Sequence, residues 1–183
     1  MHPKRSGRGR GEAGFTLIDM LFVVALIGLL STLAIPGLMR ARGAAQSSSA
    51  LGTLRVINSA QVSYAISCGL GFYSPDLPTL AKIPSGAKEG FVAQELASGP
   101  TFIKSGYSFS MAGTAVPGAP ATCNGLSIGQ SAAGYALVAD PLDTAPPARH
   151  FGTNSDGVIY EATGMLGATM PETGAPPGAM PIK

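Results

Sequence analysis

One apolar stretch near the start of the chain dominates its hydropathy pattern. Residues 15–38 read FTLIDMLFVVALIGLLSTLAIPGL and contain a single charged side chain, Asp19. At a rise of about 1.5 Å per residue, such a helix would reach about 36 Å, which exceeds a hydrocarbon layer of roughly 30 Å. The pattern therefore predicts a helix segment that can span a membrane.

Beyond Arg42 the pattern changes to helical periodicity with one apolar face, so residues 39–68 are expected to form a second, amphipathic half of the helix. Arg55 and Asn58 fall away from the centre of that face, and the helix is expected to end at Gly69. The residues expected on the apolar face are Leu51, Leu54, Val62 and Ala65.

The remaining pattern predicts a globular head over residues 69–163. Prolines and glycines punctuate a long connection, with a short helix expected around Glu89 to Leu96. Strand-like segments follow at residues 107–111, 135–139, 149–153 and 158–162, the last two as a hairpin around the turn at 154–157. The expected fold class is α+β, a long helix on a small antiparallel sheet, with a mobile Gly/Pro-rich tail of no regular structure over residues 164–183.

Composition is consistent with one globular domain plus a helix. The 183 residues are 45% hydrophobic and only 12% charged, which is too apolar for a disordered chain, while 25 Gly and 15 Pro indicate long connections.

Positive charge is concentrated in residues 1–14, which hold four Lys or Arg residues and one acid, Glu12. Taking these from the 12 basic and 10 acidic residues of the chain leaves 8 and 9, so no basic patch for nucleic acid is expected in the rest. Only Arg40 and Arg42 follow the apolar stretch closely, and this asymmetry favours a cytoplasmic N-terminus.

The chain has two cysteines, Cys68 and Cys123, and no CxxC motif that would suggest a zinc or thioredoxin site. A disulfide between them would close 55 residues, stabilise the fold by roughly 4 kcal/mol in the chain-entropy model, and require an oxidising compartment. Two buried free thiols in a cytoplasmic protein are the alternative.

An ordinary secretory signal peptide is an alternative explanation of the apolar stretch. Residues 20–30 would be its apolar region and Thr32-Leu33-Ala34 a poor cleavage site. Pro36 close behind that site and the acid at the head of the stretch both argue against it.

Residues Gly14-Phe15-Thr16-Leu17-Ile18-Asp19 resemble the GFTLIE box of type IV prepilins and of the pseudopilins of type II secretion. The resemblance covers the basic leader and the first helix. It implies that a membrane peptidase cuts after Gly14 and N-methylates Phe15, so that the apolar stretch stays in the product. A proline 21 residues beyond the first mature residue is also a family feature, and here it is Pro36.

The chain departs from the family at Asp19, where the usual residue is Glu. An acid in an apolar span costs about 2.5 to 3.5 kcal/mol on insertion scales and calls for a partner. By the resemblance, that partner is the Phe15 ammonium of an adjacent subunit. Alternatively, Asp19 only favours the helix N-terminus and faces cytoplasmic headgroups.

Pro36 removes a backbone donor and Gly37 weakens the same turn, so a bend or local melting is expected near residues 35–37. Either subunits pack and stretch by unwinding there, or the kink marks the exit from the membrane and has no further role.

The sequence thus predicts a non-enzymatic structural subunit without a cofactor or metal. It is expected in the inner membrane as a precursor, with the prepilin peptidase and a membrane assembly platform as partners, and then in an extracellular homopolymeric pilus. The alternatives are a periplasmic pseudopilin and a monomeric, membrane-tethered binding or hydrolytic domain.

Three other motifs suggest different chemistry. Gly125 to Gly129 fits G-x-S-x-G, followed by Asp140 or Asp143 and then His150 in α/β-hydrolase order, although turn residues precede it and only 54 residues follow. Residues 170–174 resemble a sortase signal but lack the apolar span and basic tail behind it. Asn154, Asp156 and Glu161 offer oxygens for calcium, with fewer acids than a calcium loop normally has.

Overall fold

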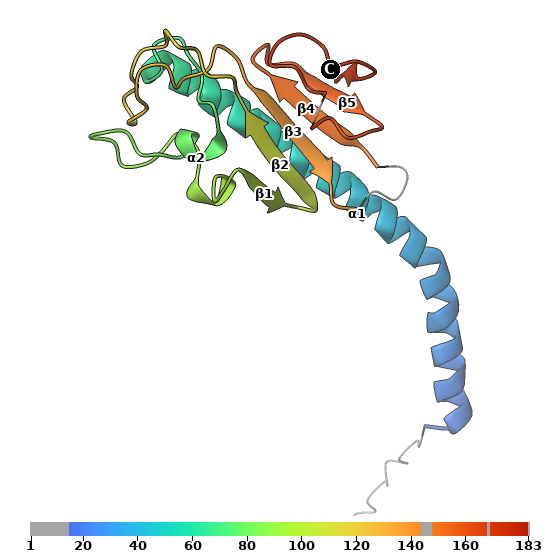
Figure 1. Ribbon diagram of the computed structural model, residues 1–183. Helices are drawn as coiled ribbons and strands as arrows, with labels where there is room; N and C mark the ends of the chain where they lie inside the picture. Colours follow the sequence, from blue (N-terminus) through green and yellow to red (C-terminus); the bar gives the residue numbers. More distant parts are fainter. Residues whose placement is uncertain (1–14, 144–147, 168, 183) are drawn as a thin grey trace, which may run out of the picture. The chain divides into compact units, whose positions relative to one another are not determined.

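The computed structural model describes residues 15–143, 148–167 and 169–182, and it contains two compact units that divide between Gly43 and Ala44. Helix α1 (Leu17–Ser67) continues through that division. In the second unit, six strands follow the chain order in one antiparallel sheet, and the last part of α1 crosses one face of this sheet (Figure 1). The remaining elements are α2 (Leu77–Leu80), the 3₁₀ helix η1 (Gln94–Leu96), β1 (Thr101–Lys104), β2 (Tyr107–Ala112), β3 (Ala136–Pro141), β4 (His150–Asn154), β5 (Ile159–Ala162) and β6 (Met180–Pro181).

This arrangement confirms the predicted α+β class, in which a long N-terminal helix with an apolar first part packs its later part on a small antiparallel sheet in a pilin-like manner. The predicted hairpin is also present, because β4 and β5 pair and the amide of Gly157 donates to the carbonyl of Asn154 at 2.9 Å.

The buried stripe of α1 recurs at helical spacing through residues 50, 54, 57, 61 and 64, all of them fully buried. Two of the residues predicted on this face, Leu54 and Ala65, are buried, and Leu51 is partly so. The prediction for Val62 was wrong, since its side chain is 49% exposed. Gln61 takes the neighbouring buried position, because its amide both donates to and accepts from the backbone of Ser74 at 2.9 Å.

The chain beyond residue 164 covers the other face of the sheet. Leu166 and Met170 form a second buried cluster with Val138 and Tyr160, and Met180–Pro181 pairs with β5 as an edge strand. A Cβ at Gly152 would lie 2.8 Å from the sulfur of Met170, so glycine makes room for this segment. The tail therefore contains one short strand that was not predicted, and its expected mobility stays a prediction.

The long connection also differs in detail from the prediction. Of the helix expected over residues 89–96, only the three-residue turn η1 forms. Helix α2 was not predicted, although Asp76 caps it by accepting from the amide of Thr79 at 2.7 Å. Strand β1 was also missed, and it pairs with β2 at the edge of the sheet.

The predicted disulfide between Cys68 and Cys123 is present, and it ties the end of α1 to the long loop before β3. The helix stops at Ser67 because the backbone turns back on itself: a Cβ at Gly69 would lie 2.1 Å from the carbonyl oxygen of Phe72. The alternative of two free thiols is excluded in this structure.

Candidate functional site

Among the described residues, the apolar first part of α1 stands out as a continuous exposed apolar surface. Its large side chains are exposed along the whole stretch, and an 18-residue window has a mean hydropathy of 2.4 with no residue buried. By length and composition it is a candidate membrane-spanning helix, which is consistent with an inner-membrane anchor. The exposed large residues are Phe15, Leu17, Ile18, Met20, Leu21, Phe22, Val23, Val24, Leu26, Ile27, Leu29, Leu30, Leu33, Ile35, Leu38 and Met39.

The only acid of this segment caps the helix. Oδ2 of Asp19 accepts from the amide of Thr16 at 3.2 Å and from the Thr16 hydroxyl, while the amide of Asp19 lies 3.4 Å from that hydroxyl oxygen. This reciprocal arrangement is a capping box, and it favours a negative charge at the positive end of the helix dipole. Within the described residues, Oδ1 of Asp19 has no hydrogen-bond partner.

The T-x-x-D spacing that produces this cap is visible in the sequence, and our sequence interpretation missed it.

The structure describes only one of the two residues at the predicted cleavage and methylation site. Phe15 is 74% exposed, whereas Gly14 and the leader lie outside the described residues.

Helix α1 continues through Pro36 and Gly37, so the structure does not show local melting there. Since proline has no N–H, the carbonyl of Thr32 loses its regular helical donor. Just before the proline, the hydroxyls of Ser31 and Thr32 donate to helix carbonyls at 2.8 and 2.7 Å. Their polarity is thereby satisfied inside the apolar stretch.

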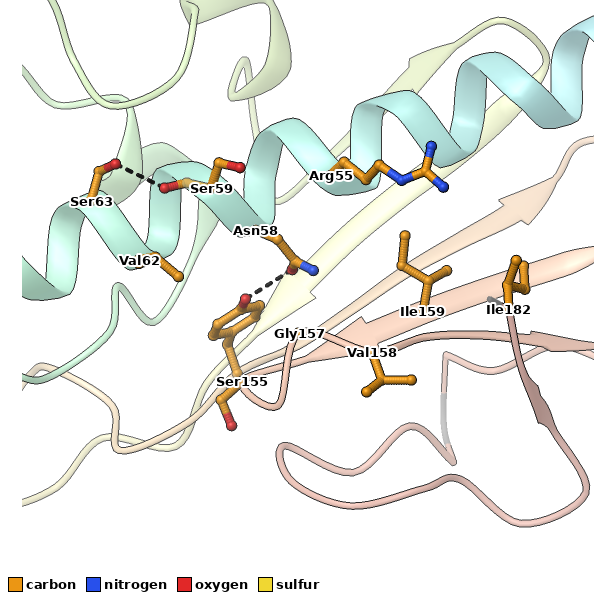
Figure 2. A pocket seen from close by; sticks show the side chains of 11 residues that line it. Arg55, Asn58, Ser59, Val62, Ser63, Ser155, Gly157, Val158, Ile159 and Ile182 are labelled. Atoms are coloured by element: carbon orange, nitrogen blue, oxygen red, sulfur yellow. Dashed lines mark hydrogen bonds between the residues drawn. The ribbon is translucent and has the colours of Figure 1, made fainter.

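A second feature lies in the head, where a groove of about 840 Å³ runs between α1 and the β4–β5 hairpin. Figure 2 shows Arg55 and Asn58 on the helix side and Val158, Ile159 and Ile182 on the opposite side. Asn58 is fixed in the groove, since its amide accepts from the Tyr135 hydroxyl and donates to that of Thr153, both at 2.8 Å. Burial, and secondarily the nearby Tyr73, raise the pKa of Tyr135, so its hydroxyl stays protonated as a donor.

The residues of the G-x-S-x-G motif do not form a nucleophile elbow. Residues 125–129 lie in a loop, with neither a strand directly before nor a helix directly after them, and Ser127 is exposed. His150 is buried at the start of β4, where its Nδ1 lies 2.7 Å from Oδ1 of Asp140. That aspartate oxygen also accepts from the amide of Leu166 at 3.4 Å, so the pair holds the tail segment against the sheet.

The oxygens considered for calcium are engaged elsewhere. Oδ1 of Asn154 accepts from the amide of Asp156 at 3.2 Å, while the Asn154 amide nitrogen donates to the carbonyls of Pro171 and Gly174. Oδ2 of Asp156 accepts from the amide of Gly174 at 2.7 Å. Glu161 pairs with Arg149, whose hydrogen bond lowers the pKa of the carboxyl. In the part of the chain that the structure describes, no group of three or more His, Cys, Asp or Glu residues could hold a metal ion.

The sortase-like residues 170–174 are built into the fold. Met170 is buried, and Glu172 accepts from both the amide and the hydroxyl of Thr114, at 2.7 and 2.6 Å. A sorting signal must be accessible to its enzyme, and these contacts give the segment a packing role instead.

Comparisons with protein-family models, with curated proteins and with solved structures found no match for this chain.

Proposed function

We propose that this protein is the structural subunit of a filament of the type IV pilus kind, trimmed after Gly14 and polymerised through residues 15–38. The observation that carries the proposal is the apolar helix segment, which is exposed along its length while the head to which it is joined has its own buried core. A surface of this kind requires lipid or other protein around it. The GFTLID sequence at its start supplies the resemblance to prepilins.

In the proposed pathway the apolar helix segment is surrounded first by lipid and then by other subunits. The precursor lies in the inner membrane with its N-terminus in the cytoplasm, where the prepilin peptidase acts, and an assembly platform then transfers the subunit to the filament. Lipid tails are as apolar as the side chains they surround, so the gain on assembly comes from helix packing and polar contacts. Each copy offers the same surfaces head to tail, and growth is open-ended when the rotation between copies does not close a ring.

Asp19 provides the polar contact in this scheme. Oδ2 serves the capping box of its own helix, and Oδ1 remains available in the described chain. We assign Oδ1 to the Phe15 ammonium that cleavage creates in the neighbouring copy. An ion pair in apolar surroundings is strong when its geometry is good and costly when one partner is missing, so the contact favours assembled over free subunits.

The test compares Asp19→Ala with Asp19→Glu in the full-length chain. Asp19→Glu keeps the charge and restores the family residue, and we expect a near-normal yield of filaments sheared from cells. Asp19→Ala removes the pair, and we expect a loss of about tenfold or more, with precursor still present in the membrane. Normal yield from Asp19→Ala would reject the pairing role.

The location of the assembled material separates the two filament classes. Fibres in the extracellular shear fraction indicate a pilus. Short periplasmic assemblies would indicate a type II secretion pseudopilus, and the absence of either would indicate a membrane-tethered domain and overturn the proposal.

A further inference from the structure

The groove beside α1 contains a cation without a partner. Arg55 is exposed at the groove wall, and no hydrogen bond or ion pair is made by its guanidinium within the described residues. It is also the only charged residue of α1 beyond Ala44. Val62, Val158 and Ile182 supply apolar surface around it. A carboxylate that entered here would be partly shielded from water, which strengthens its interaction with the cation.

Few carboxylates of the head are available for such a contact. In the described part of the chain, Glu89 and Glu95 are the acidic residues without a hydrogen bond or ion pair, since each of the others has a partner. Both are exposed and both precede the sheet. The head therefore carries one unpaired cation in a groove and a separate acidic segment on its surface.

Of the two, Glu95 is the stronger candidate, because the backbone around it is held in place. It lies in η1, where the amide of Leu96 donates to the carbonyl of Ala93 at 2.9 Å and the flanking Val92 and Leu96 are buried. This anchoring reduces the loss of conformational entropy when Glu95 forms a contact. Glu89, in contrast, follows Lys88 in an exposed stretch, and this neighbouring cation offsets its charge.

We propose that the groove is an interface between copies of this chain, in which Arg55 of one copy pairs with Glu95 of the next. The proposal rests on the filament function proposed above and adds a contact between heads to the one made by the apolar helices. Within the described chain no ion pair joins these two residues. In the proposed head-to-tail arrangement this contact is heterologous, and it repeats along a filament when the rotation between copies does not close a ring.

Charge exchange in full-length chains tests this pairing. Arg55→Glu alone and Glu95→Arg alone should each lower the yield of sheared filaments by about fivefold or more, because like charges then meet at every contact. The double variant Arg55→Glu with Glu95→Arg should recover to within about twofold of the wild type. Arg55→Glu with Glu89→Arg is the matched control, which we expect to stay low.

Co-expression shows whether the pairing is between copies. Cells that make both single variants, with different tags, should form mixed filaments, because the groove of the Arg55→Glu chain can then receive the new arginine of the Glu95→Arg chain. A pair within one chain would leave the mixture as poor as either variant, and that result would overturn the interface.

These experiments distinguish failure of the groove contact from failure of the proposed filament function. If the wild type forms filaments and neither the double variant nor the mixture recovers, the groove contact is wrong and the filament function stands. If the wild type forms none while mature chain is present in the membrane, the filament function itself fails.

Discussion

The two units of this chain use similar apolar residues in opposite ways. Phe22, in the first unit, is 64% exposed, whereas Phe109, in β2, is fully buried and stacks on Phe102 at a centroid distance of 4.7 Å. The head buries a hydrophobic core within one chain, although side chains such as Ile66 and Ile128 stay exposed, whereas the apolar helix segment buries none of its large side chains. The structure of the second unit is therefore determined by its own core, whereas the exposed apolar surface of the first unit depends on lipid or protein around it.

Polar groups show the same contrast. In the head, a buried group such as Gln61 is bonded on both its oxygen and its nitrogen. In the apolar segment, Asp19 keeps one oxygen without a partner within the described residues. Variants that should affect one unit and leave the other unchanged test this division.

The largest effect is expected from truncating a core aromatic residue. Phe109→Ala should lower the free energy of unfolding by about 3 to 5 kcal/mol, because it leaves a cavity between α1 and the sheet. Phe22→Ala, the matched control, should change head stability by less than about 0.5 kcal/mol. Chemical denaturation of the full chain in detergent measures both, and equal losses would contradict the division of roles.

Removing the disulfide should come next. Replacing both Cys68 and Cys123 by Ser frees a 55-residue loop and should cost up to about 4 kcal/mol in the chain-entropy model. We expect the variant to stay membrane-associated, because the bond lies wholly in the head. Carbonate extraction together with thermal unfolding checks both parts, and release from the membrane would count against the account.

A smaller loss is expected at the buried amide. Gln61→Ala leaves the amide and carbonyl of Ser74 without partners and should destabilise the head by about 2 kcal/mol. Gln94→Ala removes one long, partly exposed bond to Ala81 and should cost clearly less. An equal effect of the two variants in thermal unfolding would show that burial does not decide the cost.

The smallest effect is expected from the exposed pair between Arg149 and Glu161, which is joined by Nη2 and Oε2 at 2.8 Å. Arg149→Ala should cost under about 1 kcal/mol near neutral pH. Since Arg149 holds the pKa of Glu161 below its usual value, this contribution is present above the ordinary Glu pKa and is lost as the pH falls through the lowered one. The difference between variant and wild type, followed by denaturation across the acid range, should therefore shrink; a constant difference would assign it to the stacking of Arg149 on Phe151.

The sequence predicted correctly those elements that depend on residues close together in the chain. The apolar stretch, the amphipathic half of α1 and the Asn154–Gly157 turn follow from periodicity and turn residues, and the structure has each of them. What the sequence did not predict depends on contacts far along the chain. Val138 is buried because the tail covers the second face of β3, and strands β1 and β6 form because they find neighbours at the sheet edges.

The candidate site divides in the same way. Asp19, Pro36 and the two cysteines could be chosen from sequence alone, because each stands out chemically in its surroundings. The groove at Arg55 could not, since its other wall comes from residues about 100 positions later. Its polar floor, where Asn58 meets Tyr135 and Thr153, likewise exists only in the folded head.

Mass spectrometry of the N-terminus of the mature protein shows whether the apolar helix is retained after processing. If the apolar helix is kept and used for assembly, the native chain begins at Phe15 and carries one added methyl group. A chain that begins downstream of Ala34, or one that still carries its basic leader in assembled material, would contradict it.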